Sequence, residues 1–350
     1  MTTITPRERV LNLFTHQPVD RAPCFSGMGN VITEGMKTHG IRFAEAHSDA
    51  DQMATLAASM YQICGYECAV VPFDLGVEAE ALGCKMNFYE GVDADDILYP
   101  TIREKAVMKA EDIVIPENLG NQGRVPVVCR ALQLLQEKIG SEVVVGSYLL
   151  GPFTLAGQVM ELNDLLKMSF KKPDAVNAIL ERLSDLIIAL AAIYRFAGAD
   201  YITIREMGAC TDVLNPRVFK SLIQPHLTRI LGSIDGCRVL HICGGTDAII
   251  TSMVECGADA ISVDQKNDLA RTRQELGPDI LIFGNFDPYK ILVEGTPQQA
   301  AEAARTCLEN GADAVWPGCD IWPTAPVENV RALVQAAEHR RMWGWKHKSF

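Results

Sequence analysis

The chain has 350 residues, of which 48% are hydrophobic, and it carries a formal net charge of -12. This length permits one large domain or two medium ones, with enough apolar residues for a sizeable core. The net negative charge argues against a nucleic-acid-binding protein and provides no electrostatic attraction to an anionic membrane surface. No apolar run is long enough for a transmembrane helix and the N-terminus has no signal-peptide core, so we expect a cytoplasmic protein.

The predicted elements alternate between short apolar strands and amphipathic helices. The first helix begins with Thr5 as its cap, Pro6 at its first position and Glu8 three residues after the cap. Strands are expected near residues 24–25 and at 68–74, 143–148, 201–204, 238–242, 260–263, 280–283 and 312–316. Helices are expected at 5–15, 49–64, 124–139, 155–169, 173–197, 216–233, 247–256, 269–276, 296–310 and 327–339, and residues 83–122 are expected to be irregular.

These elements make eight strand–helix units, which predict a parallel sheet covered on both faces. Eight such units close naturally into a (β/α)8 TIM barrel, here with an N-terminal helical extension and with residues 1–350 forming a single domain. An open doubly wound sheet is the alternative, but no Gly-x-Gly-x-x-Gly follows the first strand. In a barrel, the polar residues that end the strands share the C-terminal mouth, where active sites are built. They are Asp74, Glu206, Cys243, Asp264, Asn285 and Cys319.

The fifth strand supplies two possible metal ligands, His241 and Cys243. Residues i and i+2 of a strand point to the same side, so both side chains would face one ion. Cys319, which follows the eighth strand, would be a third ligand, and three protein ligands suit a catalytic zinc with an open fourth position. Asp264 would be a displaceable fourth ligand. The alternative is that the histidine is a satisfied core residue and the two cysteines are small buried hydrophobes.

The other candidate residues carry open alternatives. Glu206 would hold or protonate a substrate, or serve only as a structural carboxylate. Asn285 would donate to a substrate or shape its own loop, and the same choice applies to Asp74. The 11 cysteines do not form a compact disulfide framework, and a cytosolic chain would keep them reduced. The basic, aromatic tail at residues 340–348 would contact a partner, pack in a homodimer or stay solvated.

Four stretches resemble the uroporphyrinogen decarboxylase superfamily, a family of (β/α)8 barrels: PVDRAP at 18–23, GPFTLA at 151–156, GNFDP at 284–288 and PTAPVENV at 323–330. The decarboxylases carry an Arg-Gln-Ala-Gly-Arg substrate loop, but residues 25–30 read FSGMGN here. A substrate with many carboxylates would need those arginines. The resemblance therefore speaks against a decarboxylase or lyase.

His241-x-Cys243 and Cys319 resemble instead the zinc motif of methylcobamide:coenzyme M methyltransferases, in which a glutamate stands at the position of Asp264. The resemblance implies zinc, a methylated cobamide on a small, transiently docked corrinoid protein, and a thiol such as coenzyme M as acceptor. The chain itself has no Asp-x-His-x-x-Gly corrinoid-binding signature. The alternatives are tetrahydrofolate as acceptor, or a first-step methyltransferase that loads the corrinoid from a methyl donor, in which Glu206 would join two cysteines. A non-enzymatic binding module is the remaining reading.

Overall fold

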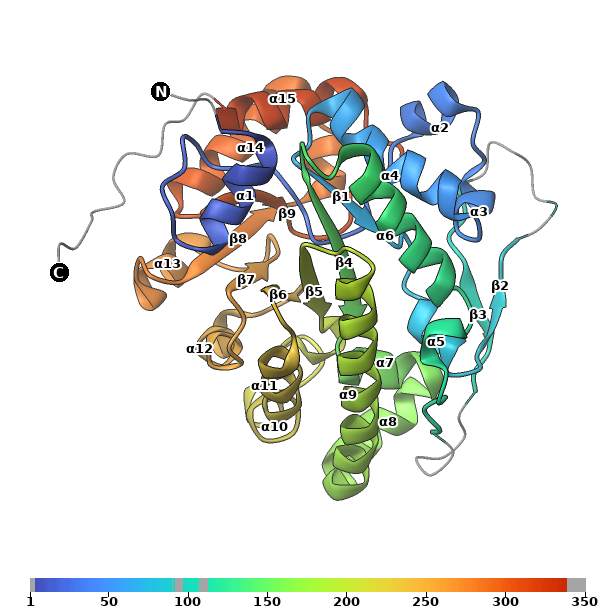
Figure 1. Ribbon diagram of the computed structural model, residues 1–350. Coiled ribbons are helices and arrows are strands. Elements are labelled where there is room, and N and C mark those ends of the chain that lie inside the picture. The colour runs from blue at the N-terminus through green and yellow to red at the C-terminus, as the bar shows by residue number, and fades with distance from the viewer. Residues whose placement is uncertain (1–3, 90, 92–96, 107–112, 339–350) are drawn as a thin grey trace.

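The structure, a computed structural model, describes residues 4–89, 91, 97–106 and 113–338, and its centre is a curled sheet of seven parallel strands (Figure 1). Neighbouring strands in the sheet follow one another in chain order. They are β1 (Cys68–Val71), β4 (Val144–Leu150), β5 (Tyr201–Arg205), β6 (Cys237–Ile242), β7 (Ala260–Val263), β8 (Leu281–Phe286) and β9 (Ala314–Pro317). Most strand residues are buried because helices cover the outer face while side chains fill the interior.

The segment around Cys24 joins the two edge strands of this sheet. It forms an isolated parallel bridge with Val315 on β9, where the Phe25 amide donates to the Val315 carbonyl over 3.2 Å. On its other side, the Glu67 amide just before β1 donates to the Cys24 carbonyl over 2.9 Å. This segment takes the place of the predicted first strand, although it is too short to be a regular strand. The predicted (β/α)8 fold class is confirmed.

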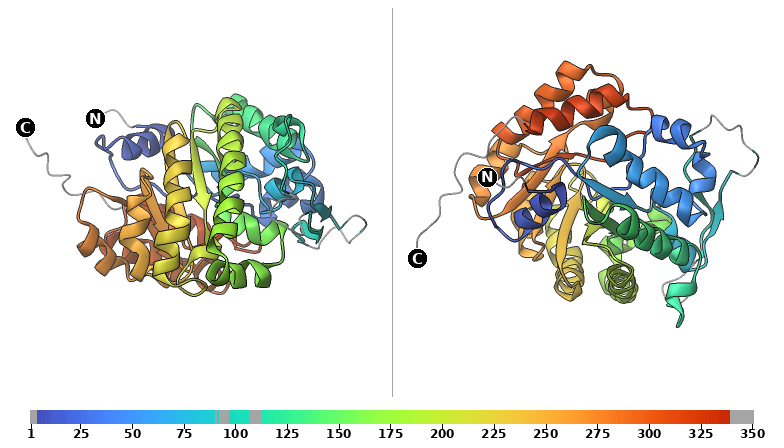
Figure 2. Two further views of the ribbon diagram at one scale, coloured as in Figure 1. Left: turned by 90° about the horizontal axis from the view of Figure 1, so that it is seen from below. Right: turned by 45° about the horizontal axis from the view of Figure 1, so that its top comes forward.

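Helices surround the curled sheet on its outer side (Figure 2). The larger ones are α4 (Ala50–Cys64), α6 (Val125–Ile139), α7 (Pro152–Val159), α8 (Leu162–Lys171), α9 (Pro173–Phe196), α11 (Gln224–Ser233), α13 (Leu269–Leu276), α14 (Pro297–Glu309) and α15 (Val327–Glu338). The short ones are α2 (Thr33–His39), α3 (Phe43–Ala46), α5 (Val77–Ala81), α10 (Pro216–Val218) and α12 (Ile250–Glu255). Within the described ranges, none of the helices combines the length and the apolarity needed to span a bilayer. The basic tail at 340–348 lies outside those ranges.

The N-terminal helix α1 (Pro6–Phe14) packs at the end of the barrel where the strands begin. Its predicted capping box is present: the Thr5 hydroxyl accepts from the Glu8 amide, and the Glu8 carboxylate accepts from the Thr5 amide. Arg7 pairs with Asp200, the residue before β5. The Phe14 ring packs against aromatic rings inside the barrel. This end of the barrel is therefore closed by packing, which leaves the opposite mouth for a site.

Three further expected elements differ in the structure. Residues 83–122, expected to be irregular, contain an antiparallel hairpin of β2 (Lys85–Asn87) and β3 (Thr101–Glu104). The helix expected at 155–169 is divided into α7 and α8; where α7 ends, the Lys105 ammonium binds the carbonyls of Gly157 and Met160. The helix expected at 216–233 contains a π-helical turn just before Pro225, which has no amide to continue the regular bonding.

Candidate active site

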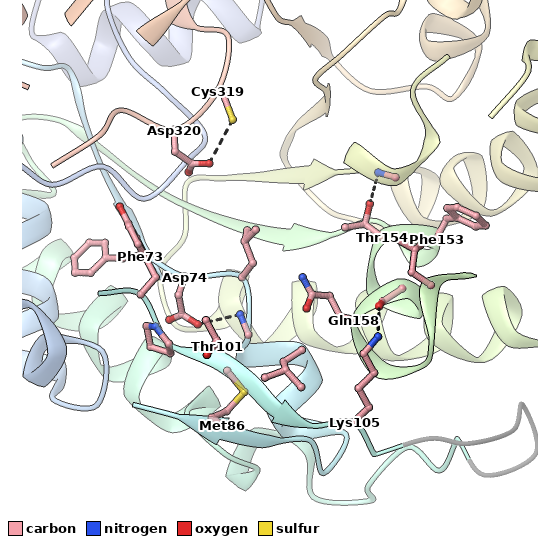
Figure 3. Close-up of a pocket in the computed structure, with 18 of the residues that line it drawn as sticks. Phe73, Asp74, Met86, Thr101, Lys105, Phe153, Thr154, Gln158, Cys319 and Asp320 are labelled. Carbon is pink, nitrogen blue, oxygen red and sulfur yellow. Dashed lines mark hydrogen bonds between the residues drawn. The ribbon is translucent and has the colours of Figure 1, made fainter. Parts of the chain in front are cut away.

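A pocket of about 730 Å³ opens at the end of the barrel where the strands finish (Figure 3). Its walls come from the segment after β1, the β2–β3 hairpin, the start and end of α7, and the loop after β9. Of the predicted site residues, Asp74 and Cys319 line this pocket. Figure 3 shows Cys319 and its neighbour Asp320 on one side and Lys105 on the opposite side. The pocket thus adjoins one of the predicted metal ligands.

His241 lies on β6 and is fully buried. Its Nδ1 lies 2.9 Å from the Ser262 hydroxyl on β7, whereas its Nε2 has no hydrogen-bond partner among the described residues. Burial, together with the nearby Arg205 cation, lowers the pKa of His241 to about 3, so the ring is neutral at pH 7. A neutral imidazole fixed at Nδ1 with a free Nε2 is the arrangement of a metal-binding histidine.

Cys243 and Cys319 come together from the ends of β6 and β9. Both are half-buried free thiols, and a hydrogen bond links the two sulfur atoms. This bond lowers the pKa of the Cys319 thiol and, with burial, raises that of the Cys243 thiol. The Cys319 sulfur also lies 3.7 Å from the Asp320 carboxylate. The structure therefore brings together two residues that are far apart in the sequence.

These side chains supply the donors that zinc prefers: two sulfur atoms and an imidazole nitrogen. Within residues 4–89, 91, 97–106 and 113–338, however, no three histidine, cysteine or acidic side chains are already arranged to hold a metal ion. The unpartnered Nε2 of buried His241 fits a metal ligand, because a buried polar atom without a partner is costly. The metal site remains a prediction, supported by the donor set.

Asp264 follows β7 and uses both carboxylate oxygens inside its own loop region. One oxygen accepts from the Gly244 amide, next to Cys243, and the other accepts from the Lys266 amide over 2.8 Å. Burial raises the pKa of Asp264. In this arrangement the carboxylate fixes the loop that carries Cys243, and it would have to give up these amide bonds to bind a metal.

Glu206 is fully buried at the end of β5, where it binds the start of α7. Its two oxygens accept from the amides of Phe153 and Thr154, over 2.9 and 2.7 Å, and from the Thr154 hydroxyl. Burial outweighs these bonds and raises the pKa of Glu206 to about 7. The geometry is that of a structural carboxylate that caps a helix from a neighbouring strand.

The Asn285 side chain is committed to the backbone of a neighbouring loop. Asn285, which lies within β8 and not after it, donates to the carbonyls of Asp264 and Asn267 over 3.0 and 2.9 Å. These bonds hold the loop that follows β7. The loop-shaping alternative for Asn285 thus has direct geometric support.

Asp74 sits beside the pocket in a buried network. Arg124 donates to both of its oxygens over 2.6 and 2.9 Å, and His47 and the Gly76 amide add two further contacts. Burial alone would raise the pKa of Asp74, but the hydrogen bonds and the Arg124 charge hold it well below its ordinary value. Asp74 is therefore an ionised carboxylate that protein groups already satisfy.

Sequence reasoning missed the ion pair between Arg205 and Asp320. The Arg205 guanidinium is fully buried at the end of β5, and it donates to both Asp320 oxygens over 3.1 and 2.6 Å. It also lies over the Tyr148 ring at 4.8 Å. Its charge acts on the thiols of Cys243 and Cys319. The signal in the sequence was an arginine that ends an otherwise apolar strand.

Comparison with known proteins supports this description of the fold. The family model for uroporphyrinogen decarboxylase matches residues 5–340. A methylcobamide:CoM methyltransferase from Methanosarcina barkeri is 32% identical over 97% of this chain and 99% of its own. One from Methanosarcina acetivorans is 34% identical with the same coverage. A uroporphyrinogen decarboxylase from Pelobacter propionicus is 25% identical over 94% of this chain and 98% of its own.

A solved structure agrees with the sequence matches. It is a methyltransferase from Methanosarcina mazei, 31% identical, with a TM-score of 0.89, and the match covers 95% of this chain and 98% of that one. The resemblance inferred from four short stretches is thereby confirmed along nearly the whole length. This chain belongs to the uroporphyrinogen decarboxylase family, and within it is similar to the methylcobamide:CoM methyltransferases.

Proposed function

We propose that this protein is a corrinoid-dependent methyltransferase that moves a methyl group from a methylated corrinoid to a thiol such as coenzyme M. The similarity to methylcobamide:CoM methyltransferases covers 97% of the chain, which supports an enzyme of this reaction class. The corrinoid would be presented by a separate small protein, because the chain has no Asp-x-His-x-x-Gly signature.

The observation that carries this proposal is the buried His241 Nε2 without a partner among the described residues, on the strand whose end carries Cys243, the thiol linked to Cys319. These three atoms would hold a zinc ion and leave one position for the acceptor sulfur. When bound, zinc would lower the pKa of the acceptor thiol and so supply a thiolate at neutral pH.

The residues of the chain position the reactants. Ser262 fixes the ring of His241, and the backbone amides of Gly244 and Lys266 hold the Asp264 loop beside Cys243. The pocket next to Cys319 would hold the acceptor with its sulfur facing the corrinoid. A bound methylated corrinoid would supply the methyl group as a methyl cation equivalent and keep the electrons of its bond to that group, while the acceptor sulfur would form the new S–CH3 bond and the thiol proton would go to solvent. The products would be a methyl thioether and the demethylated corrinoid.

The test is demethylation of free methylcobalamin, followed by absorbance, with thiols and with tetrahydrofolate as separate acceptors. We expect turnover with a thiol, and a loss of at least a hundredfold in the Cys319→Ser variant. Cys129→Ser is the matched control, because Cys129 is a half-buried free thiol on α6 that does not contact the site. Turnover with tetrahydrofolate and no thiol would refute the thiol acceptor, and equal activity of both serine variants would refute the assigned site.

A further inference from the structure

We propose that Arg205 and Asp320 are positioning residues of the metal centre. Their ion pair holds Cys319, which comes from the loop after β9, within reach of His241 and Cys243. The inference rests on the metal centre of the proposed function and adds two residues that act on that centre through Cys319. Three observations carry it: the place of Arg205 between two predicted ligands, the fixed geometry of the ion pair, and the carboxylate beside the Cys319 sulfur.

Arg205 lies between the strand of His241 and the loop of Cys319. It is the last residue of β5, and His241 is its partner in the register of β6. The amide of Glu206 donates to the carbonyl of His241 over 2.9 Å, so the two backbones are bonded at this point. The Arg205 guanidinium donates to both Asp320 oxygens over 3.1 and 2.6 Å. Because β5 and β9 are not neighbours in the sheet, this ion pair joins two separate sides of the barrel mouth.

Burial and a forked contact fix the orientation of the pair. The Arg205 guanidinium is fully buried and lies over the Tyr148 ring at 4.8 Å. The Tyr148 hydroxyl in turn donates to the carbonyl of Asp74 over 2.7 Å. Two bonds from a planar guanidinium to one carboxylate set an orientation as well as a distance, which a single ammonium group does not. The Asp320 carboxylate is therefore held in one orientation relative to β5.

The backbone of the Cys319 loop is bonded on either side of the ion pair. The Gly318 amide donates to the carbonyl of Phe286 over 2.9 Å, and the Ile321 amide donates to the Asn30 side chain over 3.0 Å. Loss of the ion pair should therefore leave the course of the loop intact and affect the two residues between these bonds. One of those two residues is Cys319.

Asp320 also lies beside the Cys319 sulfur. Its carboxylate is 3.7 Å from that sulfur, a contact that Figure 3 shows. When Cys319 binds a metal as a thiolate, this carboxylate would repel it, because like charges at such a distance disfavour each other. Arg205 is a permanent cation that balances the carboxylate and holds it toward β5. The pair thus positions Cys319 without adding net charge to the centre.

The first experiment measures metal binding by the full chain and not turnover. Zinc affinity is determined by competition with a chelator for the wild type and for Asp320→Asn. We expect the variant to bind zinc about 10- to 100-fold more weakly, which is the usual effect of removing a group that orients a metal ligand.

Asp259→Asn is the matched control for the loss of an ion pair. Asp259 accepts two bonds from the Arg238 guanidinium, over 3.1 and 3.0 Å, at the end of the barrel where the strands begin. Its side chain is 30% exposed, against 33% for Asp320. The control should lose a similar amount of stability and keep the zinc affinity of the wild type.

Substitution with Co²⁺ reports whether Cys319 stays in the centre. Thiolate ligands of Co²⁺ give a charge-transfer absorption whose intensity rises with the number of thiolates. We expect this absorption in Asp320→Asn to fall toward that of Cys319→Ser, which retains only the Cys243 thiolate. A merely structural role of the ion pair would lower the melting temperature and leave the absorption unchanged.

The double variant Arg205→Met, Asp320→Leu covers the case in which Asp320→Asn fails to fold. The single change leaves the Arg205 charge buried without its partner. Removal of both partners leaves no uncompensated charge, and such exchanges are often neutral for stability. The double variant should show the same losses of zinc affinity and of cobalt absorption.

Wild-type zinc affinity and cobalt absorption in folded Asp320→Asn or in the double variant would overturn the inference. An equal loss of zinc affinity in Asp259→Asn would overturn it as well, because the effect would then be one of general stability. Absence of zinc binding in the wild type would overturn the proposed metal centre and the inference together. Methyl transfer by the wild type, with metal binding unaltered in Asp320→Asn, would overturn the inference alone.

Discussion

The buried carboxylate of Asp74 allows a direct test of whether it supports the fold or binds substrate. In Asp74→Asn, Arg124 loses its doubly bonded counter-ion in a site where Asp74 is only 2% exposed. Removal of one partner from a buried ion pair costs about 3–5 kcal/mol. Arg124 keeps a second partner, Glu80, at 2.7 Å, so we expect the lower end, about 3 kcal/mol. In a chain of 350 residues, this corresponds to a fall of about 4 °C in melting temperature.

The pH dependence of this loss has a definite sign. The pKa of Asp74 is held well below its ordinary value, so its contribution to stability is complete above about pH 4, where the unfolded residue titrates. The contribution is lost as pH falls through the lowered pKa of the folded state. The difference between wild type and Asp74→Asn should therefore be constant from pH 5 to pH 8 and shrink as the pH falls below about 4.

The assay is thermal unfolding followed by circular dichroism across this pH range, together with KM for the acceptor. Asp185→Asn is the control, because it breaks an exposed ion pair with Arg229. The side chain of Arg229 is 39% exposed and that of Asp185 is 51% exposed, so this change should lower the free energy of unfolding by less than about 1 kcal/mol. A melting temperature of Asp74→Asn equal to that of the control, with a manyfold rise in KM, would refute the structural role and make Asp74 a substrate ligand.

Three further predictions concern residues beside the site. Glu206→Ala leaves the amides at the start of α7 without acceptors, so chemical denaturation should show a free energy of unfolding that is lower by about 2–4 kcal/mol. Unchanged stability with a raised KM for the acceptor would instead indicate that Glu206 contacts the substrate. Asn285→Ala removes two hydrogen bonds to the loop after β7 and should lower the free energy of unfolding by about 2 kcal/mol. Amide hydrogen exchange at residues 264–267 should become faster, and unchanged exchange would contradict this role. Ser262→Ala frees the ring of His241 and should weaken zinc affinity about 10- to 100-fold, as measured by competition with a chelator. The control is Thr203→Val, which removes a buried hydroxyl without a partner and should leave zinc affinity unchanged. Equal zinc affinities of the Ser262→Ala variant and the wild type would contradict the orienting role of Ser262.

Much of the barrel could be predicted because its strands are short apolar runs that end at polar residues. The positions of β1 and of β4 to β9 follow from this pattern, and helix starts such as Thr5-Pro6 and Thr296-Pro297 carry their own capping signals. The β2–β3 hairpin was missed because its strands are only three and four residues long, mostly solvent-facing, and have no tight-turn sequence between them. Only pairing in three dimensions makes them a hairpin.

The site was predictable where the chemistry of a residue type and its place at a strand end coincide. Cys243 and Cys319 were found in this way, and the structure brings their sulfur atoms together. The ion pair of Arg205 with Asp320 was not found, because nothing in the local sequence tells which carboxylate a buried arginine will meet. For the same reason, the sequence could not reveal that Glu206 binds the start of α7.

The central claim is that His241, Cys243 and Cys319 form one metal centre at the barrel mouth, and metal content tests it most directly. Elemental analysis should find about one zinc per chain in protein purified without chelators, and almost none in His241→Ala or Cys319→Ala. Cys129→Ala, which alters a thiol on α6 away from the site, should retain the metal. No zinc in the wild type, before or after reconstitution, would contradict the claim and leave the thiolate chemistry without its basis.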